Sequence, residues 1–257
     1  MFAPELATEY EGYEPAHFAE LASLEAQNFW FRARNQLILW ALKTYFPNAQ
    51  NFLEVGCGTG FVLSAIETHC PHLKTFGSEI FSSGLSIASQ RLTRTQLLQM
   101  DARQIPFANE FDVIGAFDVL EHIEQDAIVL SQMRQAMRPS GGLILTVPQH
   151  PWLWSPADEF AHHVRRYRSE ELRVKVEQAG FQVLRMTSFV SALLPLMLLS
   201  RLRQRQSHAQ YNIMAELRIK GWVNTLLEKL LTWERGLIRL GLSFPLGGSL
   251  LIIATCK

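Results

Sequence analysis

The pattern of apolar and polar positions divides this chain of 257 residues into three parts. In the first 50 residues, apolar side chains such as Phe18, Leu21 and Ile38 recur at helical spacing. From residue 51 to residue 148, short apolar runs alternate with amphipathic helical stretches. After residue 148 this alternation loosens. Strands that alternate with helices indicate an α/β fold, in which a parallel sheet carries helices on both faces.

The same pattern places the individual elements. It predicts strands at 51–55, 74–80, 96–100, 111–117, 143–147, 181–189 and 249–256, and helices at 61–69, 82–92 and 125–137. The last strand has no charged residue and is expected to be buried. Residues 148–167 are expected to form a long ordered loop, and Ser169 is expected to cap a helix that ends at Gly180. The carboxyl ends of the parallel strands should meet at one edge of the sheet, where ligands bind.

The first predicted strand runs directly into a glycine-rich turn. In Phe52-Leu-Glu-Val-Gly-Cys-Gly-Thr-Gly60, the glycines Gly56, Gly58 and Gly60 stand at alternate positions. Glycine has no Cβ, so the backbone N–H groups of such a turn approach a ligand closely. The spacing differs from the dinucleotide fingerprint, and no Gly-Lys-Ser/Thr follows as it would in a P-loop. The turn therefore predicts a nucleotide-type pocket and leaves the nucleotide open.

Acidic residues stand at the ends of four successive strands: Glu54, Glu79, Asp101 and Asp118. A carboxylate at Glu79 can accept hydrogen bonds from both hydroxyls of a ribose, and Asp101 can accept from the amino group of an adenine. A solvated loop acid, a turn aspartate and a helix cap are the structural alternatives. Four carboxylates would attract a ligand with a sulfonium and an ammonium group and would repel a pyrophosphate. The pattern therefore favours S-adenosylmethionine over NAD.

Together these motifs resemble those of the class I S-adenosylmethionine-dependent methyltransferases, of the kind that act on small molecules such as quinone precursors. The resemblance rests on Leu53–Gly60, Glu79, Asp101-Ala102 and Asp118-Val-Leu-Glu-His-Ile123, and it extends from about residue 29 to Gly180 and over the last strand. It implies a doubly wound, Rossmann-like sheet of seven mostly parallel strands, the last antiparallel beside the fifth, with amino-terminal helices and a helical insertion before the last strand. It also implies S-adenosylmethionine as cofactor, held by Glu54, Gly56, Cys57, Gly58, Gly60, Glu79, Ile80, Asp101, Ala102, Asp118 and Val119.

The predicted loop after the fifth strand carries the candidates for the reacting end. They are His150, Asp158, His162, His163, Arg166 and Tyr167. Methyl transfer depends mainly on in-line positioning, and a general base is needed only where the acceptor must lose a proton. His162 and His163 are the predicted catalytic residues; because adjacent residues seldom face one site, one of them is expected to be structural. A purely structural role for the whole group is the alternative.

Two other groups have less definite roles. His69, Cys70 and His72 have no second ligand pair at zinc-like spacing, so no metal is predicted. Arg32 and Arg34 are expected on an amino-terminal helix over the cofactor, where an arginine would pair with the carboxylate of the donor. A solvated helix face is the alternative for these two arginines.

The predicted domains are an amino-terminal helical cap (1–50), a methyltransferase core (51–189 and 245–257) and a helical insertion or lid (190–244). Within the insertion, an apolar run is followed by basic residues at 201–205, as in segments that lie at a membrane surface. A helix from Ile219 to Trp233 is strongly amphipathic. These features favour an apolar or lipid-linked acceptor and a peripheral membrane contact through 189–205. A lid or a homodimer surface is the alternative.

Charge and cysteine content narrow the class further. The 24 basic and 24 acidic residues give a net charge of zero, which removes the electrostatic case for nucleic acid. Three scattered cysteines do not form a disulfide framework. The sequence has neither a signal-peptide pattern at its start nor an apolar run of about 20 residues, so a cytoplasmic location is predicted. A non-catalytic S-adenosylmethionine-binding module and a nicotinamide-dependent oxidoreductase remain as alternatives.

Overall fold

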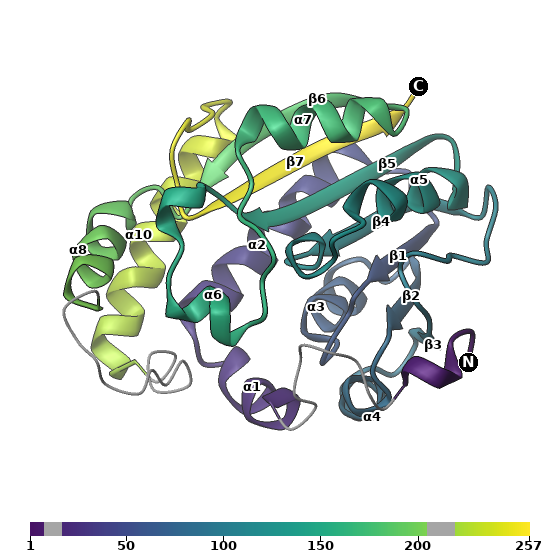
Figure 1. Cartoon of the computed structure of the whole chain (residues 1–257), viewed down its shortest axis with the longest axis horizontal. Coiled ribbons are helices and arrows are strands. Elements are labelled where there is room, and N and C mark those ends of the chain that lie inside the picture. The colour runs from purple at the N-terminus through teal and green to yellow at the C-terminus, as the bar shows by residue number, and fades with distance from the viewer. Residues whose placement is uncertain (8–16, 205–218) are drawn as a thin grey trace.

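The computed structural model describes residues 1–7, 17–204 and 219–257 of the chain. A twisted sheet runs through the middle of the molecule and helices cover both of its faces (Figure 1). The sheet has seven strands in the order β3-β2-β1-β4-β5-β7-β6. β7 runs antiparallel to both β5 and β6, and the other neighbouring pairs are parallel. The expected doubly wound sheet is therefore confirmed, including the last strand beside the fifth.

The strands lie close to their predicted positions. They are β1 (Asn51–Val55), β2 (Lys74–Glu79), β3 (Gln96–Gln99), β4 (Phe111–Phe117), β5 (Met137–Pro148), β6 (Phe181–Phe189) and β7 (Ser249–Cys256). β5 begins well before the predicted residue 143. The register between β4 and β5 shifts after the pair Phe111 and Met137, so the residues around Gly141 form an irregularity inside the strand. The sequence indicates a turn at Pro139, Gly141 and Gly142, because these residue types are common in turns. They are also common at bulges within a strand, and the structure has such an irregularity here.

Within the described ranges, the helices of at least nine residues are α1 (His17–Glu25), α2 (Phe29–Tyr45), α3 (Phe61–His69), α4 (Ser82–Arg91), α5 (Asp126–Ala136), α7 (Ser169–Gln178), α8 (Leu194–Gln204) and α10 (Gly221–Arg239). The predicted loop 148–167 is more regular than expected, because it contains α6 (Pro156–Phe160) and a 3-10 turn. Ser155 and Asp158 form a capping box at the start of α6. Ser169 does not cap α7; it is the first helical residue and Arg168 is the cap.

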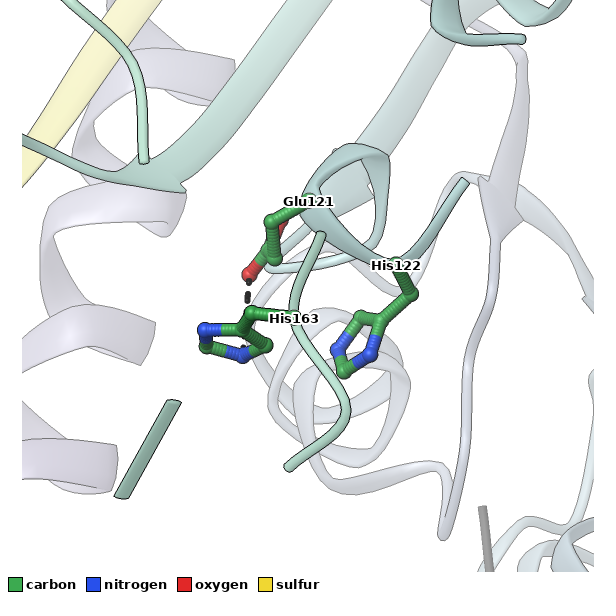
Figure 2. Close-up of side chains that lie close together, drawn as sticks. All are labelled: Glu121, His122 and His163. Carbon is green, nitrogen blue, oxygen red and sulfur yellow. Dashed lines mark ion pairs between the residues drawn. The ribbon is translucent and has the colours of Figure 1, made fainter. Parts of the chain in front are cut away.

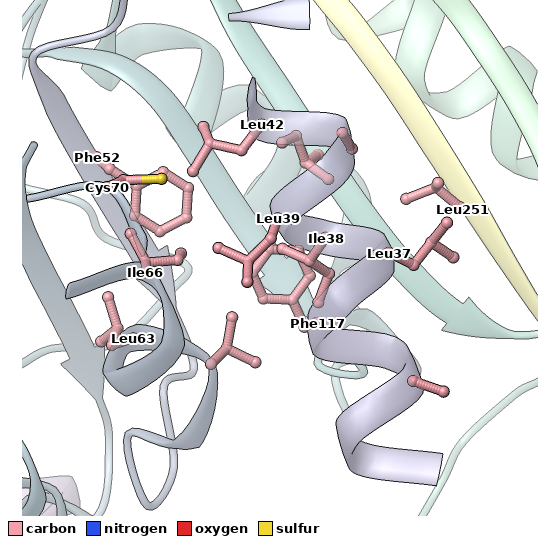
Figure 3. Packing of buried hydrophobic residues seen from close by; sticks show 14 of the residues in the cluster. Leu37, Ile38, Leu39, Leu42, Phe52, Leu63, Ile66, Cys70, Phe117 and Leu251 are labelled. Atoms are coloured by element: carbon pink, nitrogen blue, oxygen red, sulfur yellow. The ribbon is translucent and has the colours of Figure 1, made fainter. Parts of the chain in front are cut away.

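Period-two alternation in the strands divides the core into two clusters, one on each face of the sheet. On one face, Phe52 of β1 and Phe117 of β4 pack with α2, α3 and α10. Figure 3 shows the apolar side of α2 facing Phe117 and the α3 residues Leu63 and Ile66. On the other face, Leu53 packs with residues of α5 and α7. Such alternation is what a sheet buried on both faces requires.

The amino-terminal helices and the insertion join the sheet core. Asn224 of α10 accepts a hydrogen bond from the Phe29 backbone (2.8 Å) at the start of α2, and its amide donates to the Gln27 carbonyl (2.8 Å). Both α2 and α10 contribute to the same hydrophobic cluster as β1. The division into a cap, a core and an insertion remains a prediction. Among the described helices, none is both long and apolar enough to cross a membrane.

Candidate active site

A cavity of about 600 Å³ opens at the carboxyl ends of the central strands. The four strand-end acids Glu54, Glu79, Asp101 and Asp118 all line it. All other predicted cofactor residues except Gly60 also line it: Gly56, Cys57, Gly58, Ile80, Ala102 and Val119. Side chains from α1, α2, α3, α6 and α8 line other parts of its wall. The carboxyl ends of the strands, which the sequence predicted to meet at one edge of the sheet, thus border one continuous cavity.

The three glycines of the turn have left-handed backbones, with φ of +70° at Gly56, +51° at Gly58 and +75° at Gly60. A Cβ on Gly56 would lie 2.5 Å from a methyl carbon of Val119. At Gly58 the nearest atom would be a ring carbon of Phe18 at 3.6 Å, so this position has room. Gly60 lies behind the turn, where a Cβ would meet Leu92 at 2.8 Å. Gly58 therefore borders the cavity, whereas Gly60 allows close packing between α3 and α4.

Glu79 joins the glycine turn to the end of β2. Its Oε2 accepts a hydrogen bond from the Gly58 N–H (3.0 Å), and its Oε1 accepts from the N–H groups of Ile80 (2.8 Å) and Phe81 (3.2 Å). Burial raises the pKa of Glu79, and these backbone donors partly oppose that rise. The carboxylate is thus held rigidly at the wall of the cavity.

Glu54 is a buried carboxylate with spare hydrogen-bonding capacity. Its Oε2 has no hydrogen-bond partner among the described residues, and only 2% of the residue is exposed. Burial raises the pKa of Glu54 well above the usual value, although the charge of Arg34 acts in the other direction. A buried carboxylate oxygen without a donor beside an open cavity fits a cationic ligand group.

Two of the strand-end acids already have arginine partners. Asp101 accepts a bidentate pair from Arg103, with distances of 2.8 to 3.0 Å. Asp118 is paired with Arg34, whose guanidinium also lies 4.6 Å from the centre of the Trp30 ring. The negative charge of the four strand-end acids is therefore partly neutralised. Of these four, Glu54 and Glu79 form no ion pair in the described structure.

The two predicted arginines of α2 have different environments. Arg34 lines the cavity and is buried, and its Nε has no hydrogen-bond partner among the described residues. Arg32 does not line the cavity; it pairs with Glu228 of α10 at 2.6 Å. That Arg34 binds the carboxylate of the donor remains a prediction.

A buried network that the sequence did not indicate fastens α1 over the glycine turn. Glu25 accepts hydrogen bonds from the Thr59 hydroxyl (2.8 and 2.7 Å) and from Arg91 of α4 (2.8 Å). Glu25 and Thr59 line the cavity, and both are almost fully buried. The local signal for Glu25 is weak, because an acid in an amphipathic helix normally indicates a solvated face.

His163 is the better placed of the two predicted catalytic histidines. Its Nδ1 lies 2.9 Å from Oδ1 of Asp158, which also accepts from Arg166 Nε (2.7 Å). Burial alone would raise the pKa of Asp158, but the bond from His163 and the charge of Arg166 lower it to about 2. In the neutral form of the ring, the ionised Asp158 therefore favours the proton on Nδ1, which leaves the lone pair on Nε2. His162 lines the same cavity but is exposed, with a left-handed backbone (φ +54°).

Figure 2 shows a second group of side chains around this histidine. Nε2 of His163 lies 4.0 Å from Oε1 of Glu121, a fully buried carboxylate whose two oxygens have no hydrogen-bond partner among the described residues. Burial raises the pKa of Glu121 well above the usual value and lowers that of His122 to about 3. The three side chains offer ligand atoms within 4.8 Å of one another. They could hold a metal ion, but only by using the nitrogen that would act as a base.

Two other loop candidates lie outside the cavity lining. Tyr167 is fully buried, and its hydroxyl donates to Asp126 at 2.7 Å. His150 stacks on Trp152 with a centroid distance of 4.9 Å. Of the predicted loop residues, Asp158, His162, His163 and Arg166 therefore reach the cavity, and Tyr167 and His150 do not.

Comparison with known proteins agrees with this geometry. A family model described as a methyltransferase domain matches residues 23–186. A probable S-adenosylmethionine-dependent methyltransferase of Mycobacterium tuberculosis is 26% identical over 166 residues, which cover 63% of this chain and 58% of that protein. The trans-aconitate 2-methyltransferase of an Azoarcus species is 25% identical over 119 residues, 46% of this chain and 45% of that protein. This chain thus spans less than two thirds of the length of either relative.

A structural neighbour supports the same fold. The phosphoethanolamine N-methyltransferase 2 of Haemonchus contortus superposes with a TM-score of 0.62 at 17% identity, covering 95% of this chain and 57% of that one. The strand order with an antiparallel seventh strand, the glycine turn at β1 and the family match over residues 23–186 lead to one assignment. The chain belongs to the methyltransferase-domain family of class I S-adenosylmethionine-dependent methyltransferases.

Proposed function

We propose that the protein transfers a methyl group from S-adenosylmethionine to a small acceptor that is apolar or linked to a lipid. The observation that carries the proposal is a single cavity that contains both the glycine turn and the Asp158–His163 pair. The turn would bind the donor, and the histidine would face the acceptor. The names of the relatives, which include a trans-aconitate and a phosphoethanolamine methyltransferase, support a small molecule as the acceptor class.

The residues of the cavity fit the donor. Gly58 has no side chain at the wall, and the free Oε2 of Glu54 suits an ammonium group. Glu79 would bind the ribose, while Asp101 and Ala102 would border the adenine. S-adenosylmethionine supplies a methyl group that the positive sulfur has already activated. Glu54 and Glu79, which form no ion pair in the described structure, would repel the pyrophosphate of a dinucleotide, which disfavours the oxidoreductase alternative.

His163 is proposed to accept the proton of a hydroxyl or similar group on the acceptor. Asp158 holds the ring through Nδ1, so the lone pair of Nε2 is available to accept a proton. The positive charge that then develops on the ring would be stabilised by the ionised Asp158. A base in such a position contributes about 10²–10⁴-fold to the rate. The remaining acceleration would come from holding the acceptor in line with the methyl group.

The lining favours an apolar acceptor. Aromatic side chains from α1, α2, α3 and α6 border the cavity, namely Phe18, Trp30, Phe31, Phe61 and Phe160. Met197 and Arg201 of α8 border it from the insertion. The predicted membrane contact through 189–205 remains a proposal; the side chains of 202–205 lie outside the described residues.

Donor binding and transfer can be tested separately. Calorimetry should detect S-adenosylhomocysteine and no NADH; the opposite result would refute the proposal. Tritium from labelled S-adenosylmethionine should then enter a lipid extract of the source cells rather than their water-soluble metabolites. His163→Asn should abolish this transfer and keep donor binding, whereas the neighbouring His162→Asn should keep both. Equal transfer by the two variants would exclude His163 as the base.

A further inference from the structure

α10 has an apolar outer face that the core does not use. Its inner face packs against the rest of the protein through Leu231 and Ile238, which are 5% and 1% exposed. On the outer face, Trp222, Trp233 and Leu240 at the end of the helix are 72%, 62% and 82% exposed. A surface helix ordinarily needs one apolar stripe, and α10 has two. Packing among the described residues therefore accounts for the inner stripe alone.

The outer residues form one continuous surface, which we call the α10 outer face: Trp222, Leu226, Leu230, Trp233 and Leu240. Leu226 is 59% exposed and follows Trp222 by one turn of the helix. With 3.6 residues per turn, these five positions fall within an arc of about 80°. α10 lies at one end of the molecule, beside α8 and far from α4 and β3 (Figure 1).

The charges of α10 are segregated in the same direction. Both of its acids are engaged on the inner side: Glu228 binds Arg32 of α2, and the buried Glu234 accepts from the Ala192 N–H at 2.7 Å. Of the exposed charged residues, Lys229 lies about 20° from Trp222 around the helix, whereas Lys220 and Arg239 stand at the two ends of α10. An apolar stripe with tryptophans and only basic charges around it is typical of helices that lie in a membrane surface.

We propose that the α10 outer face binds the surface of a membrane that contains anionic lipids. Lys229 beside the apolar stripe and Lys220 at the start of the helix would meet the lipid headgroups, while the tryptophans and leucines would enter the boundary of the acyl chains. A symmetric dimer through this face is disfavoured, because the face carries no acid that could pair with Lys229 of the second copy. The proposal needs no methyl donor and adds to the 189–205 segment a second, structurally defined contact.

Co-sedimentation of the full chain with lipid vesicles tests the proposal. The protein should sediment with vesicles of phosphatidylglycerol and phosphatidylcholine and much less with phosphatidylcholine alone. Leu226→Glu should weaken this partitioning at least tenfold. Ile128→Glu is the matched control, because Ile128 is 49% exposed on α5, on another part of the surface, and this variant should bind like the wild type. Brominated lipids should quench tryptophan fluorescence, and most quenching should be lost in a Trp222→Phe, Trp233→Phe double variant.

Three results would overturn the proposal. The first is that the wild-type protein stays in the supernatant with both kinds of vesicle. The second is that the Leu226→Glu variant binds vesicles as tightly as the Ile128→Glu variant. The third is that light scattering shows a dimer of the wild-type protein and that Leu226→Glu dissociates this dimer. Circular dichroism and binding of S-adenosylhomocysteine verify that each variant is folded. Vesicle binding is measured without donor, so a protein that binds vesicles but no S-adenosylhomocysteine would refute the proposed function and leave this inference standing.

Discussion

Replacing Glu79 by glutamine tests the proposed donor site at the level of single hydrogen bonds. An ionised carboxylate has about four lone-pair positions. Three are already used: Oε1 accepts from the N–H groups of Ile80 and Phe81, and Oε2 accepts from that of Gly58. The observed conformation therefore leaves room for about one strong bond to a ribose hydroxyl, where the sequence suggested two.

In Glu79→Gln, the remaining oxygen can keep the bonds from Ile80 and Phe81, and an NH2 group replaces Oε2. This group cannot accept from Gly58 or from a ribose hydroxyl. A hydrogen bond to a charged group is worth about 1.5–3 kcal/mol, so the affinity for S-adenosylhomocysteine should fall about 10- to 150-fold. The lost bond from Gly58 should also lower the free energy of unfolding by about 1–3 kcal/mol. Calorimetry and urea unfolding measure the two effects.

Glu67 provides a matched control. Its carboxylate also accepts from three backbone N–H groups, those of Thr93 (3.2 Å), Arg94 (2.8 Å) and Thr95 (2.7 Å), but it does not line the cavity. Glu67→Gln should lose stability and keep its affinity for the donor product. If Glu79→Gln binds within twofold of Glu67→Gln, the placement of the ribose at Glu79 is wrong.

The same carboxylate predicts a pH dependence. Burial raises the pKa of Glu79, so on acidification it takes up a proton before an ordinary glutamate does. The affinity for S-adenosylhomocysteine should therefore decline as the pH falls towards this raised pKa. In Glu79→Gln this part of the pH profile should disappear; an unchanged profile would show that another group controls binding.

Four further substitutions probe the surrounding structure. Glu54→Gln should stabilise the ligand-free protein at pH 7 by about 1 kcal/mol, or about 2–4 °C in Tm, because the pKa of Glu54 is raised on folding and its ionised form therefore opposes folding above the ordinary pKa. This gain in stability should vanish on acidification, and an unchanged Tm at pH 7 would contradict the reasoning. Gly58→Ala should lower the free energy of unfolding by only about 1–2 kcal/mol, the strain of a left-handed backbone, whereas Gly56→Ala should lower it more because its Cβ would overlap the side chain of Val119. Urea unfolding measures both variants, and equal losses would be inconsistent with the observed geometry of the turn. Tyr167→Phe removes the bond to Asp126 and should lower stability by about 1.5–3 kcal/mol without changing donor binding, so a loss of binding would show that Tyr167 belongs to the site.

Much of the fold followed from local pattern. Short apolar runs located β1 and β4 with their observed bounds, and the buried, uncharged β7 matched its prediction. The errors occurred where local signals are ambiguous. Pro139 and the glycines near it indicated a turn, but they lie in an irregular part of β5. Ser169 has the chemistry of a cap and is nevertheless the first residue of α7.

The site was only partly visible in the sequence. The glycine turn and the strand-end acids could be found because each is defined by a few consecutive residues and by its place after a strand. Partners distant in sequence could not be found. Glu25 meets Thr59 and Arg91, and Asp118 meets Arg34, because the sheet and α2 bring separate segments together. These contacts determine which of the acids form ion pairs.

Short-range periodicity, the turn at β1 and the acids at the strand ends were enough to indicate the family, the sheet and the edge of the sheet where a donor would bind, because each signal lies within a few consecutive residues. The folded chain was needed to distinguish His163 from His162, since the distinction depends on the direction of each side chain and on the position of Asp158 in space. It was also needed to separate the two apolar faces of α10. Hydrophobic spacing marks a face as apolar, but the packing of α2 decides which of the two faces is buried and which remains exposed.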